Sequence, residues 1–125
     1  MCLNINKNSH LNVKLHKLSD IQKGTLIELK GYVDAYCSFD LDNLLRAIDK
    51  EHYTNVILDL KDLKQMSSCG IGFILKLSRL IHNGLVLINV EAKVLDTMSI
   101  IGLIQIITIL DSKDDAIAFL KTNNS

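Results

Sequence analysis

The stretch Val56-Ile-Leu-Asp-Leu-Lys-Asp-Leu-Lys-Gln-Met-Ser-Ser-Cys-Gly-Ile-Gly-Phe-Ile-Leu75 decides how this chain of 125 residues is interpreted. Its first three residues form a continuous apolar run, which is typical of a strand that is buried on both faces. A short polar connection leads to the adjacent hydroxyls of Ser67 and Ser68, and apolar residues then return at helical spacing. The stretch therefore predicts a buried strand, a short connection, and a helix that begins at the two serines.

The two serines allow a structural and a functional interpretation. Backbone N–H groups in the first turn of a helix have no partner within the helix, and the helix dipole favours negative charge there. Serine is among the best N-caps, and the same position receives a phosphate well. A phosphate on Ser68 is expected to lie beside free N–H groups of Cys69, Gly70 and Ile71. From the residues alone the cap is favoured, but Ser67 can cap the helix while Ser68 stays exposed.

Hydrophobic periodicity predicts the other elements around this stretch. Strands are expected at 11–18, 25–31, 55–60, 85–89 and 104–110, and helices at 38–50, 69–83, 92–101 and 111–120. Turn and cap residues mark several boundaries, and residues 122–125 are expected to fray. The boundary residues are a hairpin turn at 22–24, Ser38 as an N-cap followed by Phe39 on the apolar face, and the helix-ending Gly84 and Gly102.

The order of these elements predicts an α/β fold. We expect one domain over 1–125, with its core at about 11–120. Its mixed, mostly parallel sheet of about five strands would pack against about four helices. Asp34 and Asp59 would lie at strand ends near Ser68. Asp59 is expected to pair with backbone N–H groups of its loop rather than to join Asp34 in a metal or acid–base site.

Composition excludes several classes of function. Lys+Arg and Asp+Glu both number 14, so the formal net charge is zero. This argues against a protein that binds nucleic acid or a charged membrane surface mainly by electrostatic attraction. The longest apolar stretch, residues 98–110, is too short to span a bilayer, and the N-terminus lacks the pattern of a signal peptide. Three scattered cysteines fit a reducing cytosol, and neither they nor the four histidines have metal-ligand spacing. A cytoplasmic protein without metal or cofactor is expected.

In its order of elements and in several motifs, the chain resembles the STAS domain of anti-sigma factor antagonists over about residues 11–120. In that family a buried strand is followed by Asp-Ser-Ser/Thr-Gly-hydrophobic-Gly at the start of a helix, where 66–72 here reads Met-Ser-Ser-Cys-Gly-Ile-Gly. Gly31-Tyr-Val-Asp34 matches the family's Gly-x-hydrophobic-Asp, and Gly102-Leu103 precedes the last strand as in the family. The chain departs from the signature at two positions, because Ser67 replaces its Asp and Cys69 replaces its second Ser or Thr.

The resemblance implies a bacterial phosphoprotein that regulates transcription by partner switching and has no catalytic activity of its own. Ser68 matches the family's phosphoacceptor. In its unphosphorylated form the chain would bind an anti-sigma factor with serine kinase activity. Phosphorylation would weaken this binding, and a serine phosphatase would restore it. The expected partner-binding residues are Asp34, Ser67, Ser68, Cys69, Gly70, Ile71, Lys76 and Arg79.

The sequence also allows two other classes of function. A non-phosphorylated STAS accessory subunit of an ABC-type membrane lipid-transport complex is favoured by the loss of the signature Asp and disfavoured by the retention of Ser68. An enzyme has little support, because no acid–base or nucleophile constellation stands out.

Overall fold

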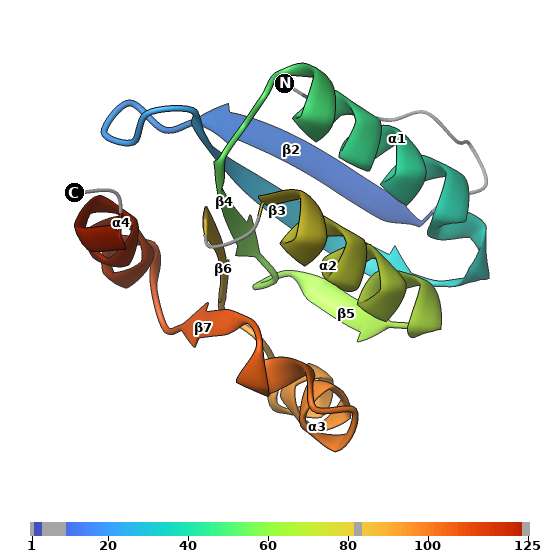
Figure 1. Ribbon diagram of the computed structural model, residues 1–125. Helices are drawn as coiled ribbons and strands as arrows, with labels where there is room; N and C mark the ends of the chain where they lie inside the picture. Colours follow the sequence, from blue (N-terminus) through green and yellow to red (C-terminus); the bar gives the residue numbers. More distant parts are fainter. Residues whose placement is uncertain (1, 4–9, 82–83, 124–125) are drawn as a thin grey trace.

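The computed structural model describes residues 2–3, 10–81 and 84–123 (Figure 1). Strands and helices alternate after an opening antiparallel pair, as the sequence predicts. The elements are β1 (Cys2–Leu3), β2 (Leu11–Lys17), β3 (Gly24–Val33), η1 (Ala35–Cys37), α1 (Ser38–Lys50), β4 (Asn55–Asp59), β5 (Leu63–Met66), α2 (Ser68–Ile81), β6 (Leu85–Ile88), α3 (Ala92–Ile100), η3 (Leu103–Gln105), β7 (Thr108–Leu110) and α4 (Lys113–Asn123).

The strands form one mixed sheet, which confirms the predicted α/β class. Six strands follow the order β1-β2-β3-β4-β6-β7, and β5 pairs with the end of β3. The pairs β1–β2 and β2–β3 are antiparallel, and the pairs from β3 onward are parallel. Among the described residues, no helix combines the length and the apolar character needed to cross a membrane.

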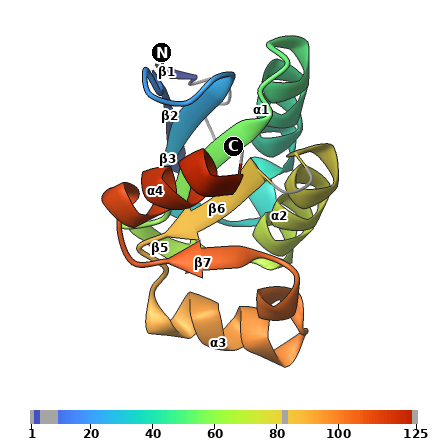
Figure 2. The same ribbon diagram turned by 60° about the vertical axis from the view of Figure 1, so that its left-hand side comes forward.

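Helices cover the two faces of the sheet unequally (Figures 1 and 2). The larger core packs α1, α2 and α3 on one face, where alternate residues of the central strands such as Ile27, Leu29, Val56 and Leu58 are buried. A smaller core lies under α4 on the other face, around Ile57 and its neighbours. Burial of both faces explains why the run 56–58 is continuously apolar.

Strand β5 was not predicted, because residues 61–66 read as a polar connection. Strand β3 has ten residues and β4 has five, so the end of β3 extends beyond β4. Strand β5 pairs with this end, from Gly31↔Leu63 to Val33↔Met66. Because β5 occupies this place, the start of α2 lies beside the end of β3.

The predicted start of α1 was partly wrong. The 3-10 turn η1 precedes the helix, and its N-cap is Asp34, whose side chain accepts a hydrogen bond from the backbone N–H of Tyr36. Ser38 is therefore the first residue of α1 and not its cap. Phe39, predicted for the apolar face, is 57% exposed, because the buried face consists of Asp40, Leu41, Leu44 and Ile48.

Three other predicted boundaries need correction. The hairpin connection covers residues 18–23, and Gly24 already belongs to β3. The predicted strand 104–110 shrinks to β7, because Gly102 in the left-handed conformation (φ 75°) ends α3 and the chain then turns through η3. Helix α4 begins two residues later than predicted, with the Ser112 hydroxyl accepting from the N–H of Asp115, and it includes Thr122 and Asn123 of the segment expected to fray. The rest of that segment, 124–125, lies outside the described residues.

The sequence predicts that Gly84 ends α2 as its C′ residue. The structure describes α2 as far as Ile81, and residues 82–83, on which this prediction depends, lie outside the described part. The described surroundings give a different reason for the glycine. A Cβ at Gly84 would overlap the carbonyl oxygen of Thr54 and lie 3.0 Å from Asn55 Oδ1. Only glycine lets the start of β6 approach the start of β4 this closely.

Replacing Gly84 with alanine should destabilise the fold by about 1–3 kcal/mol, because the new methyl group meets backbone that cannot move freely. Urea unfolding would measure the change. Gly72→Ala is the matched control. Apart from its chain neighbours and the backbone of its own helix, no atom of the described chain lies within 4 Å of a Cβ there, so we expect unchanged or slightly higher stability from the better helix former. Equal stability of the two variants would contradict the close-packing account of Gly84.

Candidate functional site

Ser67 caps α2 and hydrogen-bonds the start of this helix to strand β3 of the sheet. Its N–H donates to the carbonyl oxygen of Val33 at 2.9 Å, which continues the pairing of β5 with β3. Its hydroxyl accepts from the N–H of Cys69 at 3.2 Å. Its carbonyl oxygen accepts from the N–H groups of Gly70 and Ile71, at 3.0 and 3.2 Å. The structure thus gives Ser67 the capping role that the sequence left open between the two serines.

These hydrogen bonds correct one expectation. The N–H groups of Cys69, Gly70 and Ile71 were expected to be free to receive a phosphate on Ser68. All three already donate to Ser67. A phosphate at Ser68 would therefore be stabilised mainly by the helix dipole, or would have to displace the Ser67 cap.

Ser68 differs from Ser67 in its surroundings. It is the first residue of α2 and its side chain is exposed. Its hydroxyl has no hydrogen-bond partner in the part of the chain that the structure describes. It therefore stands at the surface with an accessible oxygen, on a helix end that Ser67 holds in place.

Gly70 allows α2 to begin close to the strands. It is buried, and a Cβ there would overlap Met66 Sδ and lie 2.9 Å from Val33 Cγ1. Ile71 is half-buried and packs against the larger core. These two predicted site residues hold the helix start in position, and neither presents a polar group to a partner.

The starts of α1 and α2 lie side by side. Ser38 Oγ and Cys69 Sγ are 3.2 Å apart, so the residue that replaces the family's second hydroxyl contacts the first residue of α1. Farther along the same helices, Lys76 Nζ lies 3.7 Å from Asp42 Oδ1, and both side chains are exposed. Arg79 is exposed one turn farther on. Ser68, Gly72, Lys76 and Arg79 follow one outer stripe of α2 at helical spacing.

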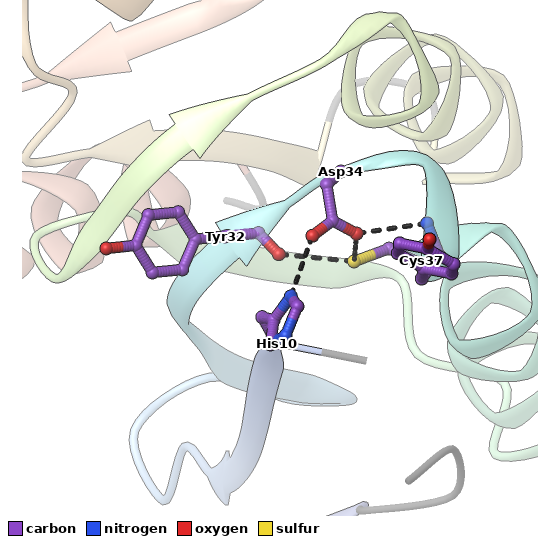
Figure 3. A network of polar contacts seen from close by, with 5 residues as sticks. His10, Tyr32, Asp34 and Cys37 are labelled. Carbon is purple, nitrogen blue, oxygen red and sulfur yellow. Dashed lines mark hydrogen bonds and ion pairs between the residues drawn. The ribbon is translucent and has the colours of Figure 1, made fainter. Parts of the chain in front are cut away.

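A polar network around Asp34 forms the other side of this site (Figure 3). Asp34 Oδ2 lies 3.0 Å from His10 Nδ1, and Oδ1 accepts from the N–H of Tyr36 at 3.0 Å. The buried Cys37 Sγ lies 3.2 Å from the carbonyl oxygen of Tyr32 and 3.6 Å from Asp34 Oδ1. The hydrogen bond with His10, followed by that from Tyr36, holds the pKa of the Asp34 carboxyl below its usual value.

The backbone conformation of Gly31 allows His10 to lie next to Asp34. It has φ 103°, and β3 changes register between Gly31 and Tyr32. The N–H of Tyr32 donates to the carbonyl oxygen of His10 at 3.1 Å, and a Cβ on Gly31 would overlap that same oxygen. The family's Gly-x-hydrophobic-Asp pattern here therefore supports a bulge that aligns the start of β2 with the Asp34 turn.

Exposed aromatic side chains flank the Asp34 network. Tyr36 and Phe39 are 60% and 57% exposed, and Tyr32 is also exposed. The His10 ring meets the rings of Tyr32 and Tyr36 edge to face, with centroids 6.4 and 6.5 Å apart. We call the surface formed by His10, Tyr32, Asp34, Tyr36, Ser38, Phe39, Ser67, Ser68 and Cys69 the helix-start surface.

Sequence reasoning missed His10 and the aromatic residues of this surface. His10 lies 24 positions before Asp34 and shares no motif with it. Phe39 was assigned to the core from its helical spacing. The one available signal was the cluster of aromatic residues between 32 and 39, next to the matched Asp34.

Asp59 is not part of the helix-start surface. Its carboxylate instead accepts hydrogen bonds from the residues that follow β4 and β6. Its Oδ1 accepts from the N–H of Lys61 and from Asn89 Nδ2, both at 3.0 Å. This confirms the expected pairing with loop N–H groups. Over the described ranges, no three His, Cys, Asp or Glu side chains converge as a metal site would require.

The His10 contact should be visible in the titration of Asp34. A carboxyl group whose pKa is lower in the folded than in the unfolded state stabilises the fold above the unfolded pKa, and this contribution is lost as the pH falls through the folded pKa. We expect His10→Ala to move the NMR titration midpoint of the Asp34 carboxyl upward, toward the ordinary Asp value. His16→Ala, which removes the similar contact with Glu28, should leave that midpoint unchanged. An unshifted midpoint in His10→Ala would refute the assigned cause.

Comparison with known proteins identifies the family of this fold. The STAS domain family model matches residues 13–116. No curated protein matches the chain significantly. Among solved structures, the anti-sigma factor antagonist SpoIIAA in its unphosphorylated form has a TM-score of 0.73 and 19% identity, covering 88% of this chain and 96% of SpoIIAA.

Two further structures are similar. The phosphorylated form of Bacillus SpoIIAA has a TM-score of 0.66 and 20% identity, covering 86% of this chain and 98% of its own. An anti-sigma factor antagonist from Mycobacterium paratuberculosis has a TM-score of 0.77 and 12% identity, covering 89% of this chain and 94% of its own. At these identities the likeness shows a shared fold. With the family model matching most of its length, the chain belongs to the STAS domain family.

Proposed function

We propose that this STAS domain is an anti-sigma factor antagonist whose partner binding is controlled by phosphorylation of Ser68. The observation that carries the proposal is the separation of the two serines, because Ser67 caps α2 and Ser68 keeps an exposed hydroxyl. SpoIIAA, an anti-sigma factor antagonist with the same fold, has been described in both phosphorylated and unphosphorylated forms. The chain would act in the cytoplasm by binding, without catalysis of its own.

The proposed partner is an anti-sigma factor with serine kinase activity, and it would bind the helix-start surface. Exposed Tyr36 and Phe39 offer apolar contact area of the kind that dominates protein interfaces. Ser68 lies on the adjoining helix start, and the contact between Ser38 and Cys69 keeps the two starts together. Asp34, Lys76 and Arg79 would supply polar contacts at the margin.

Phosphorylation would weaken this complex electrostatically. A phosphoserine carries about −1.5 to −2 charges near neutral pH, and burying that charge in an interface is costly unless the partner offers cations. Because Ser67 already satisfies the first turn of α2, the added phosphate would remain exposed and the fold would be unchanged. A serine phosphatase would then restore binding.

One observation favours a second candidate function. The first-turn N–H groups that would hold a phosphate are occupied by Ser67, which stands where the family carries an Asp. A non-phosphorylated accessory subunit of an ABC-type lipid-transport complex would need neither free N–H groups for a phosphate nor the family's Asp. A pull-down separates the two, since a kinase-fold partner supports the first function and a transporter subunit the second.

Incubation with the cognate kinase and ATP should add one phosphate per chain, and Ser68→Ala should abolish it. Intact-mass spectrometry measures both results. Ser99→Ala, at an exposed serine of α3, is the matched control and should accept phosphate normally. No mass increase with a kinase that is active on another substrate would exclude the proposed switch.

Two variants of Ser67 separate its capping role from the missing carboxylate. Ser67→Ala should lower the free energy of unfolding by about 1 kcal/mol, because the N–H of Cys69 loses its acceptor. Ser67→Asp should keep that stability, since Asp also caps and its charge suits the helix dipole. If a carboxylate here positions the acceptor serine, Ser67→Asp should also be phosphorylated faster than the wild type. A Ser67→Ala protein as stable as the wild type would contradict the capping role.

A further inference from the structure

The side chain of His10 contacts three different parts of the helix-start surface (Figure 3). Its Nδ1 lies 3.0 Å from Oδ2 of Asp34, the residue that caps η1. Its ring also meets two other rings edge to face, those of Tyr32 near the end of β3 and Tyr36 in η1. One side chain that no sequence motif predicts therefore links the carboxylate with two tyrosines of the surface.

The backbone of His10 is held in place independently of this side chain. Its carbonyl oxygen accepts from the N–H of Tyr32 at 3.1 Å, and Gly31 leaves room for that oxygen. His10 directly precedes β2, and all seven residues of that strand pair with β3. A substitution of the His10 side chain should therefore leave the strands in place and change only the contacts of the ring.

The two tyrosines that His10 contacts lie at the surface. Tyr32 is 43% exposed and Tyr36 is 60% exposed. Exposed aromatic side chains often anchor protein interfaces. A ring that already occupies its binding position loses less conformational freedom when a partner arrives. Contacts that hold these rings in place before binding would therefore strengthen the binding.

Three elements present titratable groups to the His10–Asp34 pair. Tyr32 lies in β3, Asp34 in the turn, and Tyr36 and Cys37 in η1. The two tyrosine rings face His10, and the Cys37 thiol lies 3.6 Å from Asp34 Oδ1. Among the described residues, Asp34 is the ion-pair partner of His10. The charge of this pair therefore depends mainly on the imidazole and the carboxyl group.

The attraction within the pair should change with pH. The hydrogen bond with His10 is the main cause that holds the pKa of Asp34 below its usual value, so this carboxylate stays charged near neutral pH. Histidine is the side chain whose charge ordinarily changes between about pH 5 and pH 8. The contact is therefore strongest when His10 is protonated and weakens as the pH rises and the proton is lost.

We propose that protonated His10 positions Asp34, Tyr32 and Tyr36 for partner binding, and that loss of its proton weakens this binding. The inference rests on the proposed function, because the partner is the kinase-fold anti-sigma factor that would bind the helix-start surface. His10 acts through its neighbours and is a positioning residue. His16 provides a matched control, since its Nε2 makes a similar exposed contact with Glu28 Oε2 at 2.9 Å, outside the helix-start surface.

NMR spectroscopy tests the positioning without any partner. In the wild type, the ring signals of Tyr32 and Tyr36 should shift with pH at the same midpoint as the His10 ring. His10→Gln keeps a side chain that can donate to Asp34 but does not titrate in this range, so the shift should disappear. His16→Gln should retain the shift. Tyrosine signals that do not follow the titration of His10 in the wild type would overturn the proposal.

Titration calorimetry with the kinase-fold anti-sigma factor, at about pH 6 and about pH 8, tests the consequence for binding. The ratio of the dissociation constant at the higher pH to that at the lower pH is compared between variants, because titration of the partner affects all of them alike. Exposed ion pairs are weak, so this ratio should be about two- to fivefold larger in the wild type than in His10→Gln. His16→Gln should match the wild type.

The two possible failures are distinguishable. An equal ratio in the wild type and in His10→Gln, with binding intact, would overturn the role of His10 and leave the proposed function standing. Absence of binding at both pH values would contradict the proposed function itself, and this inference with it.

Discussion

The capping of α2 by Ser67 is the interaction on which the site depends. Its N–H extends the β5 pairing to Val33, and its hydroxyl and carbonyl oxygens accept from the first turn of the helix. One residue therefore fixes both the end of a strand and the start of a helix. Gly70 complements it, because the absence of a side chain lets the helix start lie against Met66 and Val33. Ser68 is held at the surface because these neighbours are fixed.

The same arrangement explains why a modification of Ser68 would act on binding and leave the fold intact. Ser68 contributes no side-chain hydrogen bond among the described residues, so charge added there disturbs no internal contact. Tyr36 and Phe39 are exposed and lie close in sequence to Ser38, which contacts Cys69, the residue after Ser68.

The sequence predicted the class of fold and most helices, because these depend on local periodicity and on cap chemistry. It predicted a serine cap at the start of α2 but left open which of Ser67 and Ser68 provides it. It failed where the outcome depended on distant parts of the chain. Strand β5 forms because β3 is longer than β4, and neither fact is visible in the polar residues 61–66. His10 meets Asp34 through a bulge at Gly31. The β-branched run before Leu110 could not reveal that residues 103–105 form a turn, because apolar runs of this kind occur in strands and buried turns alike.

The most direct test of the account is the affinity of the unphosphorylated protein and of protein carrying phosphoserine at position 68 for the kinase-fold anti-sigma factor. Isothermal titration calorimetry can measure both under the same conditions. The account predicts tight binding of the unphosphorylated form and binding weaker by about 30-fold or more when the phosphate is present, because the added charge must be desolvated in the contact. Equal affinity of the two forms would contradict the proposal that Ser68 controls partner binding.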